Sequence, residues 1–204
     1  MTELTAELLK HRAIYIPWQD ETPLYQAGPA IAQYLAQAHR VPLSVLCITK
    51  SNSPDELSRV PIVTERSGSL VDGGVVLVYC PNYKLLSKLA HLSRSVIVMV
   101  EWPTENLSGW ARLHGAYNLI TQEEMAPGLS DQARELMDQI VFEGYKGWDD
   151  SIAIRITERH IAELQELGEY DRELVLAYCR EERGERGIEK LYKILDRFDA
   201  GPAR

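Results

Sequence analysis

The feature that most constrains the fold is the stretch from Val71 to Pro103, which predicts a strand, a turn, a helix and a second strand. Val75–Tyr79 and Val96–Val100 are almost entirely apolar, and such short apolar runs are typical of strands buried on both faces of a parallel sheet. The leucines at positions 85, 86, 89 and 92 lie between them on one side of a predicted helix, the side needed to cover a sheet. The stretch therefore indicates an α/β fold class.

Further strand and helix patterns alternate on both sides of this unit. The additional expected strands are Ala13–Pro17, Pro42–Thr49, Pro61–Thr64, Ala116–Thr121 and Ile152–Ile156. The additional expected helices cover 3–11, 25–39, 104–115, 130–143 and 157–167, with two more beginning near 171 and 187. Thr104, Ser130 and Thr157 are the expected N-caps. Ile152–Ile156 alternates with a period of two, as an edge strand does, although the same residues can also begin a helix.

Alternating strands and helices predict a Rossmann-like, doubly wound, mostly parallel sheet of five to seven strands. The last three helices predict a small C-terminal helical extension. We therefore expect a Rossmann-like α/β domain over residues 1–156 and a helical extension over 157–204 that packs on it.

Composition narrows the class of protein. The formal net charge is −8, which disfavours nonspecific nucleic-acid binding because phosphate contacts depend on clustered Lys and Arg. Residues 117–150 carry eight acidic side chains against Arg134 and Lys146. The three cysteines are far apart in sequence, and no apolar run reaches membrane-spanning length. These observations favour a soluble, cytoplasmic protein with reduced thiols and no membrane association.

The fold class itself predicts where a site would lie. In an open α/β sheet, ligands bind beyond the carboxyl ends of the strands, where the strand order reverses. The candidate ligand-binding residues in the loops that follow these strands are Trp18, Asp20, Asn82, Tyr83, Glu101 and Trp102.

Two interpretations of these loops remain open. In the first, they form a pocket for a small nucleotide-like ligand, with Trp18 or Trp102 stacking on it and the carboxylates of Asp20 and Glu101 binding a ribose or a divalent ion. In the second, Asp20 and Glu101 cap helices and Trp102 packs against a neighbouring helix.

Motifs that would define an enzyme class are missing from the sequence. The first strand is followed by bulky and acidic residues where a dinucleotide-binding loop requires glycines. There is no G-x-S-x-G motif, and no Cys/His cluster has the spacing of a metal site. Cys80 ends a strand before a predicted helix, but Pro81 removes a backbone donor there, so a structural role is favoured. Catalytic residues, metal ligands and a cofactor are therefore not identified.

Two features nearer the C-terminus suggest a partner surface. Tyr145 and Trp148 lie in a connection that also contains two glycines and two acids, where an aromatic surface for a partner and a tight turn with a buried Trp148 are both possible. The helical extension resembles a helix-turn-helix only in spacing. Its second helix carries at least as many acids as basic groups, which makes nucleic-acid binding unfavourable.

The leading functional hypothesis is a cytoplasmic, non-catalytic binding or accessory protein. It would act through a nucleotide-like small molecule or through a protein partner at the C-terminal helices. The alternative is a metal-dependent hydrolase or transferase that acts on a nucleotide-like substrate at the carboxyl ends of the strands.

Overall fold

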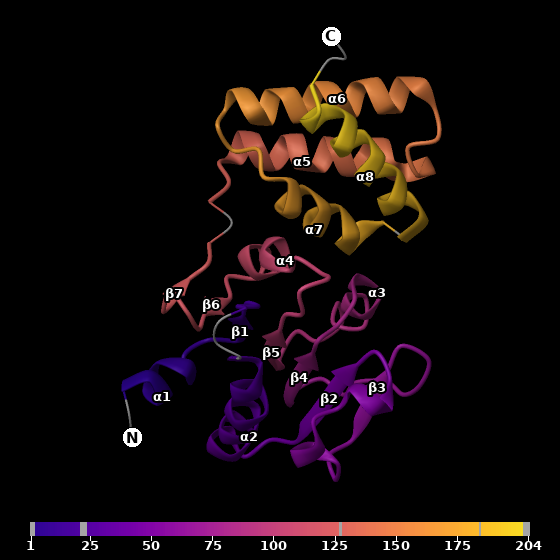
Figure 1. Ribbon diagram of the computed structural model, residues 1–204. Coiled ribbons are helices and arrows are strands. Elements are labelled where there is room, and N and C mark those ends of the chain that lie inside the picture. Colours follow the sequence, from indigo (N-terminus) through magenta and orange to yellow (C-terminus); the bar gives the residue numbers. More distant parts are fainter. Residues whose placement is uncertain (1–2, 21–23, 127, 184, 202–204) are drawn as a thin grey trace. The chain divides into compact units, whose positions relative to one another are not determined.

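The structure is a computed structural model that describes residues 3–20, 24–126, 128–183 and 185–201 (Figure 1). The chain divides into two compact units, residues 1–126 and 127–204. We call them the α/β unit and the helical unit and describe each by itself. The extension predicted from residue 157 lies within the helical unit, as do residues 128–156.

The α/β unit contains a seven-stranded, mostly parallel sheet, as the sequence predicts. Its strands are β1 (Ala13–Ile16), β2 (Leu43–Cys47), β3 (Ile62–Thr64), β4 (Val75–Tyr79), β5 (Val96–Val100), β6 (Tyr117–Asn118) and β7 (Glu123–Glu124). Their order in the sheet is β3-β2-β4-β5-β1-β6-β7. Every neighbouring pair is parallel except β6 and β7.

The two apolar runs that predicted the fold are adjacent central strands. β4 and β5 pair along their full length, from Val75 opposite Val96 to Tyr79 opposite Val100. Leu77 and Val98, which face each other in this register, are both fully buried. Burial on both faces explains why these segments lack the alternation of a half-exposed strand.

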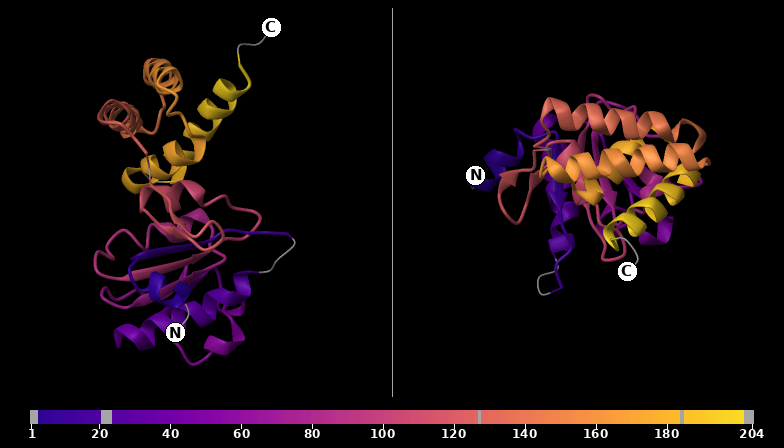
Figure 2. Two further views of the ribbon diagram at one scale, coloured as in Figure 1. Left: turned by 90° about the vertical axis from the view of Figure 1, so that its left-hand side faces the viewer. Right: turned by 90° about the horizontal axis from the view of Figure 1, so that it is seen from above.

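Helices cover both faces of the sheet (Figure 2). On one face are α1 (Glu3–Leu8) and α2 (Ala27–His39), and on the other are α3 (Tyr83–Leu86) and α4 (Ser108–Leu113). Short 3-10 turns complete the unit: η1 (Leu24–Gln26), η2 (Lys50–Asn52) and η3 (Asp55–Leu57). Helix α2 approaches the sheet closely at Gly28, where a Cβ atom would lie 2.5 Å from Cγ2 of Val100.

Three predicted elements of this unit are shorter than expected. The helix between β4 and β5 ends at Leu86, although Leu89 and Leu92 remain buried. The predicted strand 116–121 pairs with β1 only over the two residues of β6. The predicted N-cap at Thr104 is wrong, because α4 begins at Ser108. The amide of Leu107 donates to the Glu101 carboxylate instead, and this contact keeps the intervening loop out of the helix.

The helical unit consists of α5 (Asp131–Glu143), η4 (Gly144–Lys146), α6 (Ser151–Glu166), α7 (Arg172–Glu182) and α8 (Glu185–Asp199). Helix α5 contacts α6 and α7, and α8 contacts α6 and α7. The sequence prediction for α5 is confirmed. Its predicted N-cap, Ser130, accepts a hydrogen bond from the amide of Ala133, and all five predicted inward residues are buried.

The predicted strand over Ile152–Ile156 is wrong, because these residues form the first turns of α6. The Asp150 carboxylate accepts hydrogen bonds from the amides of Ile152 (2.9 Å) and Ala153 (2.8 Å), which fixes the helix start there. Thr157 is therefore not an N-cap and is buried within the helix. The helix cap at Asp150 and the helical periodicity of the longer segment therefore determine the structure here, and the alternation of isoleucines does not.

Candidate functional site

The carboxyl edge of the sheet contains two places where neighbouring strands send their connections to opposite faces. β1 continues into α2 on one face, and its neighbour β5 continues into α4 on the other. The same occurs at β2 and β4, since η3 packs on the α2 face and α3 packs on the opposite face. Such switch points are the places where open α/β sheets bind ligands.

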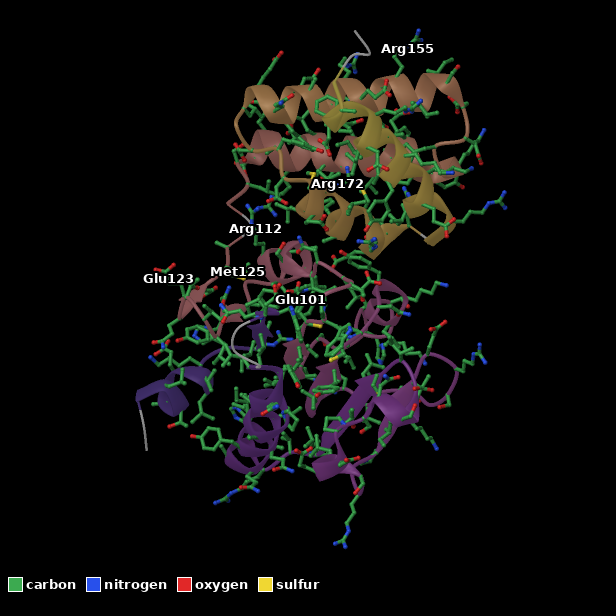
Figure 3. All side chains as sticks on the ribbon, viewed as in Figure 1. Glu101, Arg112, Glu123, Met125, Arg155 and Arg172 are labelled. Carbon is green, nitrogen blue, oxygen red and sulfur yellow. The ribbon has the colours of Figure 1, made fainter. Side chains whose placement is uncertain are left out.

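Glu101 follows β5 directly and lies at the β1/β5 switch point (Figure 3). Its side chain is buried, and its two oxygens accept three hydrogen bonds. The donors are the Tyr15 hydroxyl (2.6 Å), the Trp18 amide (2.9 Å) and the Leu107 amide (2.7 Å). Glu101 thus joins the loops that follow β1 and β5, and a ligand or metal would have to compete with these three donors.

The same buried environment shifts the pKa of Tyr15. Burial raises the pKa of its hydroxyl well above the ordinary value, and the neighbouring Glu101 charge raises it further. The hydroxyl therefore remains protonated and acts as a hydrogen-bond donor to Glu101. The sequence reasoning missed this residue, although a tyrosine within the apolar run of β1 signals a hydroxyl that needs a buried partner.

Three aromatic rings lie together at this switch point. Trp18 stacks on Tyr25 with ring centroids 5.7 Å apart and meets Trp102 edge-to-face at 4.9 Å, and Tyr25 and Trp102 are 6.0 Å apart. The Trp18 indole N–H donates to the Asp20 carboxylate at 2.8 Å. We call Trp18, Tyr25 and Trp102 the aromatic cluster. Trp102 is 40% exposed, so part of the cluster surface is accessible.

The remaining predicted residues lie in the loop after β4. Asn82 caps α3 by accepting from the amide of Leu85 at 3.2 Å, and its amide group donates to Glu65 at 3.4 Å. The Tyr83 hydroxyl donates to the carbonyl of Asn106, in the loop after β5. The structure thus brings Trp18, Asp20, Glu101 and Trp102 together, while Asn82 and Tyr83 contact residues outside this group.

The cysteines at this edge have structural surroundings. Burial, together with the neighbouring Cys47 thiol, raises the pKa of Cys80 to about 12, and burial also raises the pKa of Cys47. A thiol with such a pKa is protonated at neutral pH and is a poor nucleophile. Cys80 also has a positive φ of 49°, which turns the chain between β4 and Pro81.

In the helical unit, the two predicted partner-surface residues lie in different environments. Tyr145 is 78% exposed, and the Arg183 guanidinium lies 6.0 Å from its ring centroid. Trp148 is only 1% exposed, and its indole N–H donates to the Thr157 hydroxyl at 3.0 Å. A Cβ atom on Gly144 would lie 2.4 Å from the Trp148 ring, so the glycine makes room for the indole.

Within the described parts of the chain, no three His, Cys, Asp or Glu side chains come together as metal ligands. Among the same residues, no helix is both long enough and apolar enough to cross a bilayer.

Fold and edge together define an α/β protein with a doubly wound, mostly parallel sheet, an aromatic cluster at one switch point and a separate helical unit. Comparison of the chain with protein-family models, with curated proteins and with solved structures found no match.

Proposed function

We propose that this is a cytoplasmic, non-catalytic binding protein whose α/β unit holds a planar, nucleobase-like ligand at the aromatic cluster. The observation that supports the proposal best is the group formed by Trp18, Tyr25 and Trp102 at a topological switch point. Aromatic faces bind bases by stacking, with about 1–3 kcal/mol per base. The cytoplasmic location is supported by three unpaired cysteines, which suit a reducing compartment.

Asp20 lies beside the aromatic cluster and can accept hydrogen bonds from a ligand there. One of its oxygens accepts the Trp18 indole N–H, and an ionised carboxylate can accept further hydrogen bonds. A ribose hydroxyl beside the stacked base would be a suitable donor. A nucleoside therefore fits the chemistry of the cluster better than an apolar ring does.

The metal-dependent alternative has less support. It assigns Glu101 as a ligand, yet both Glu101 oxygens already accept hydrogen bonds, and the side chain is buried. Binding of a metal there would leave buried donors without an acceptor, which is costly.

The proposal is tested by titrating the protein with adenosine, guanosine and cytidine while following tryptophan fluorescence, with and without Mg²⁺. We expect at least one nucleoside to quench the fluorescence in both conditions. Trp102→Ala should weaken its binding about tenfold, because a stacking face is lost. Tyr145→Ala, which removes an exposed ring from the helical unit, is the control. Absence of quenching by all three nucleosides, or equal binding by both variants, would refute the proposal.

The helical unit has a second role in this proposal, which is contact with a protein partner. Its exposed Tyr145 and Phe142, which are 78% and 68% accessible, support an interaction surface near the end of α5.

A further inference from the structure

A groove of about 580 Å³ lies in the helical unit, between the turn that precedes α6, α6 itself and α8. Its floor is apolar and consists of Trp148, Ile154 and Ile194. Its rim combines the basic side chains of Lys190, Lys193 and Arg197 from α8 with the carboxylates of Asp149 and Asp196. An apolar floor with a charged rim is the usual composition of a small recognition site.

The floor is held in place before any ligand arrives. The Trp148 indole is fixed by its hydrogen bond to Thr157 and lies against Gly187, where a Cβ atom would be 3.4 Å from the ring. Trp148 also has a positive φ of 54°, a conformation that is unfavourable for a bulky side chain. Ile194 is 2% exposed. A rigid floor reduces the entropy lost when a partner side chain is inserted.

The basic part of the rim results from the spacing of Lys and Arg residues along α8. Arg186, Lys190, Lys193 and Arg197 recur at intervals of four, three and four residues, so all four lie on one face of the helix. The groove therefore has a positive edge in a chain whose net charge is −8.

Among the described residues, neighbouring acids pair with two of the three basic side chains that line the groove, and Lys193 is the exception. Lys190 forms an ion pair with Asp149, and Arg197 pairs with Glu158 at 3.4 Å. Asp196, which also lines the groove, is paired with Arg172 at 2.6 Å. Lys193 is exposed, and no residue that the structure describes forms a hydrogen bond or ion pair with it.

We propose that this groove binds an acidic segment of a partner protein, with an apolar side chain on the floor and carboxylates at Lys193 and its neighbours. Complementary charge favours such a segment, and the floor suits an anchor residue. A nucleic acid fits less well, because phosphate binding depends on clustered Lys and Arg. Of the three basic side chains at the rim, Lys190 and Arg197 are already paired with acids. The inference rests on the partner role proposed above for the helical unit and specifies its surface and its partner chemistry.

The test uses the full-length chain and a short fluorescein-labelled peptide that alternates glutamate and leucine, followed by fluorescence anisotropy. We expect binding that weakens with added salt, because surface charges are screened. Lys193→Glu should weaken binding about tenfold through charge repulsion at the rim. Arg155→Glu makes the same charge change on an exposed part of α6 outside the groove and should bind as the wild type does (Figure 3).

Three further probes separate the possible occupants: an oligo-glutamate peptide without leucine, a single-stranded oligonucleotide, and the unlabelled protein examined by sedimentation. The oligo-glutamate should bind more weakly than the leucine-containing peptide. The proposal is overturned if neither peptide binds, if Arg155→Glu reduces binding as much as Lys193→Glu, or if the oligonucleotide binds more tightly than the peptide. It is also overturned if Lys193→Glu abolishes a dimer that the peptide fails to disrupt, since the occupant would then be a second copy.

The result is independent of the α/β unit. Trp102→Ala should leave peptide binding unchanged, and Lys193→Glu should leave nucleoside quenching unchanged. Failure of the nucleoside titration alone would therefore refute the ligand part of the proposed function and leave the groove proposal standing. Failure of peptide binding alone would refute the groove proposal and leave the ligand part of the proposed function standing.

Discussion

Two carboxylates at opposite edges of the same sheet organise the loops of the α/β unit in different ways. Glu101, at the carboxyl edge, is buried and accepts two backbone amides and one phenol. Asp72, at the amino edge, accepts the amides of Gly73 and Arg94 and the Ser95 hydroxyl, each at 2.9 Å. Asp72 also pairs with the Arg94 guanidinium at 3.2 Å.

The two carboxylates differ in what they hold together and in how exposed they are. At the amino edge, a partly exposed carboxylate serves a tight turn, and its surroundings hold its pKa well below the ordinary value, with the hydrogen bond from the Arg94 amide as the largest cause. At the carboxyl edge, the buried Glu101 carboxylate accepts hydrogen bonds from within the α/β unit. The exposed side chain beside it is the aromatic ring of Trp102. A carboxylate at a switch point is thus not by itself a sign of a catalytic or metal-binding group.

The largest expected effect is that of Glu101→Leu. Loss of the carboxylate leaves three donors without their acceptor and should reduce the free energy of unfolding by about 3–4 kcal/mol. Glu101→Gln keeps the shape and one acceptor oxygen and should cost about half as much. Urea unfolding followed by tryptophan fluorescence gives both values. Equal stability of Glu101→Leu and wild type would show that the carboxylate does not hold the two loops.

Tyr15→Phe tests one of the three donors separately. The substitution removes only the hydroxyl and leaves Glu101 with its two backbone donors, so we expect a loss of about 1 kcal/mol in the same unfolding measurement. The effects of Tyr15→Phe and Glu101→Leu should be non-additive in the double variant, because the two groups share one hydrogen bond. Additive effects would mean that the hydroxyl and the carboxylate act independently.

Asp72→Asn tests the amino edge and should show a pH dependence of stability. The folded-state pKa of Asp72 is lowered, so its contribution is complete above the unfolded-state value, at pH about 4. The contribution is lost progressively as the pH falls from there toward the lowered pKa. We expect the variant to unfold at lower urea concentration at pH 7 and to approach the wild type below pH 4. A gap between the variant and the wild type that does not narrow as the pH falls below about 4 would contradict the assignment.

The smallest expected effect is that of Arg94→Ala. The Arg94 side chain is 78% exposed, and exposed ion pairs contribute little to stability. The main interaction with Asp72 comes from the backbone amide, which the substitution keeps. Urea midpoints of the variant and the wild type should agree within error at neutral pH. A loss similar to that of Asp72→Asn would show that the guanidinium, and not the turn, is the principal partner.

Much of the fold was predictable from local patterns. The apolar runs of β4 and β5 gave the parallel centre of the sheet, and the cap and inward stripe of α5 gave that helix correctly. The errors occurred where local signals compete. Ile152–Ile156 has a strand-like alternation, but Asp150 caps a helix there. Thr104 has good capping chemistry, but Glu101 binds the Leu107 amide and delays the helix.

The candidate site was predictable in position but not in detail. The rule for open sheets placed Trp18, Asp20, Glu101 and Trp102 at one edge, and the structure groups them around β1 and β5. Sequence could not give the role of Glu101, because its phenolic partner Tyr15 is 86 positions away. It also assigned Trp148 to an exposed surface as one of two alternatives, and the structure places that ring inside the helical unit.

The fold class follows from the sequence alone, because hydrophobic periodicity is a local property that each segment carries along its own length. The strand order, the partners of Glu101, the grouping of the aromatic cluster and the groove beside α8 emerge only from the packing of the folded chain. Each of these depends on side chains that are distant in sequence and become neighbours only after the strands and helices pack. Polar groups find their partners at that stage, because burial makes an unpaired donor or acceptor costly.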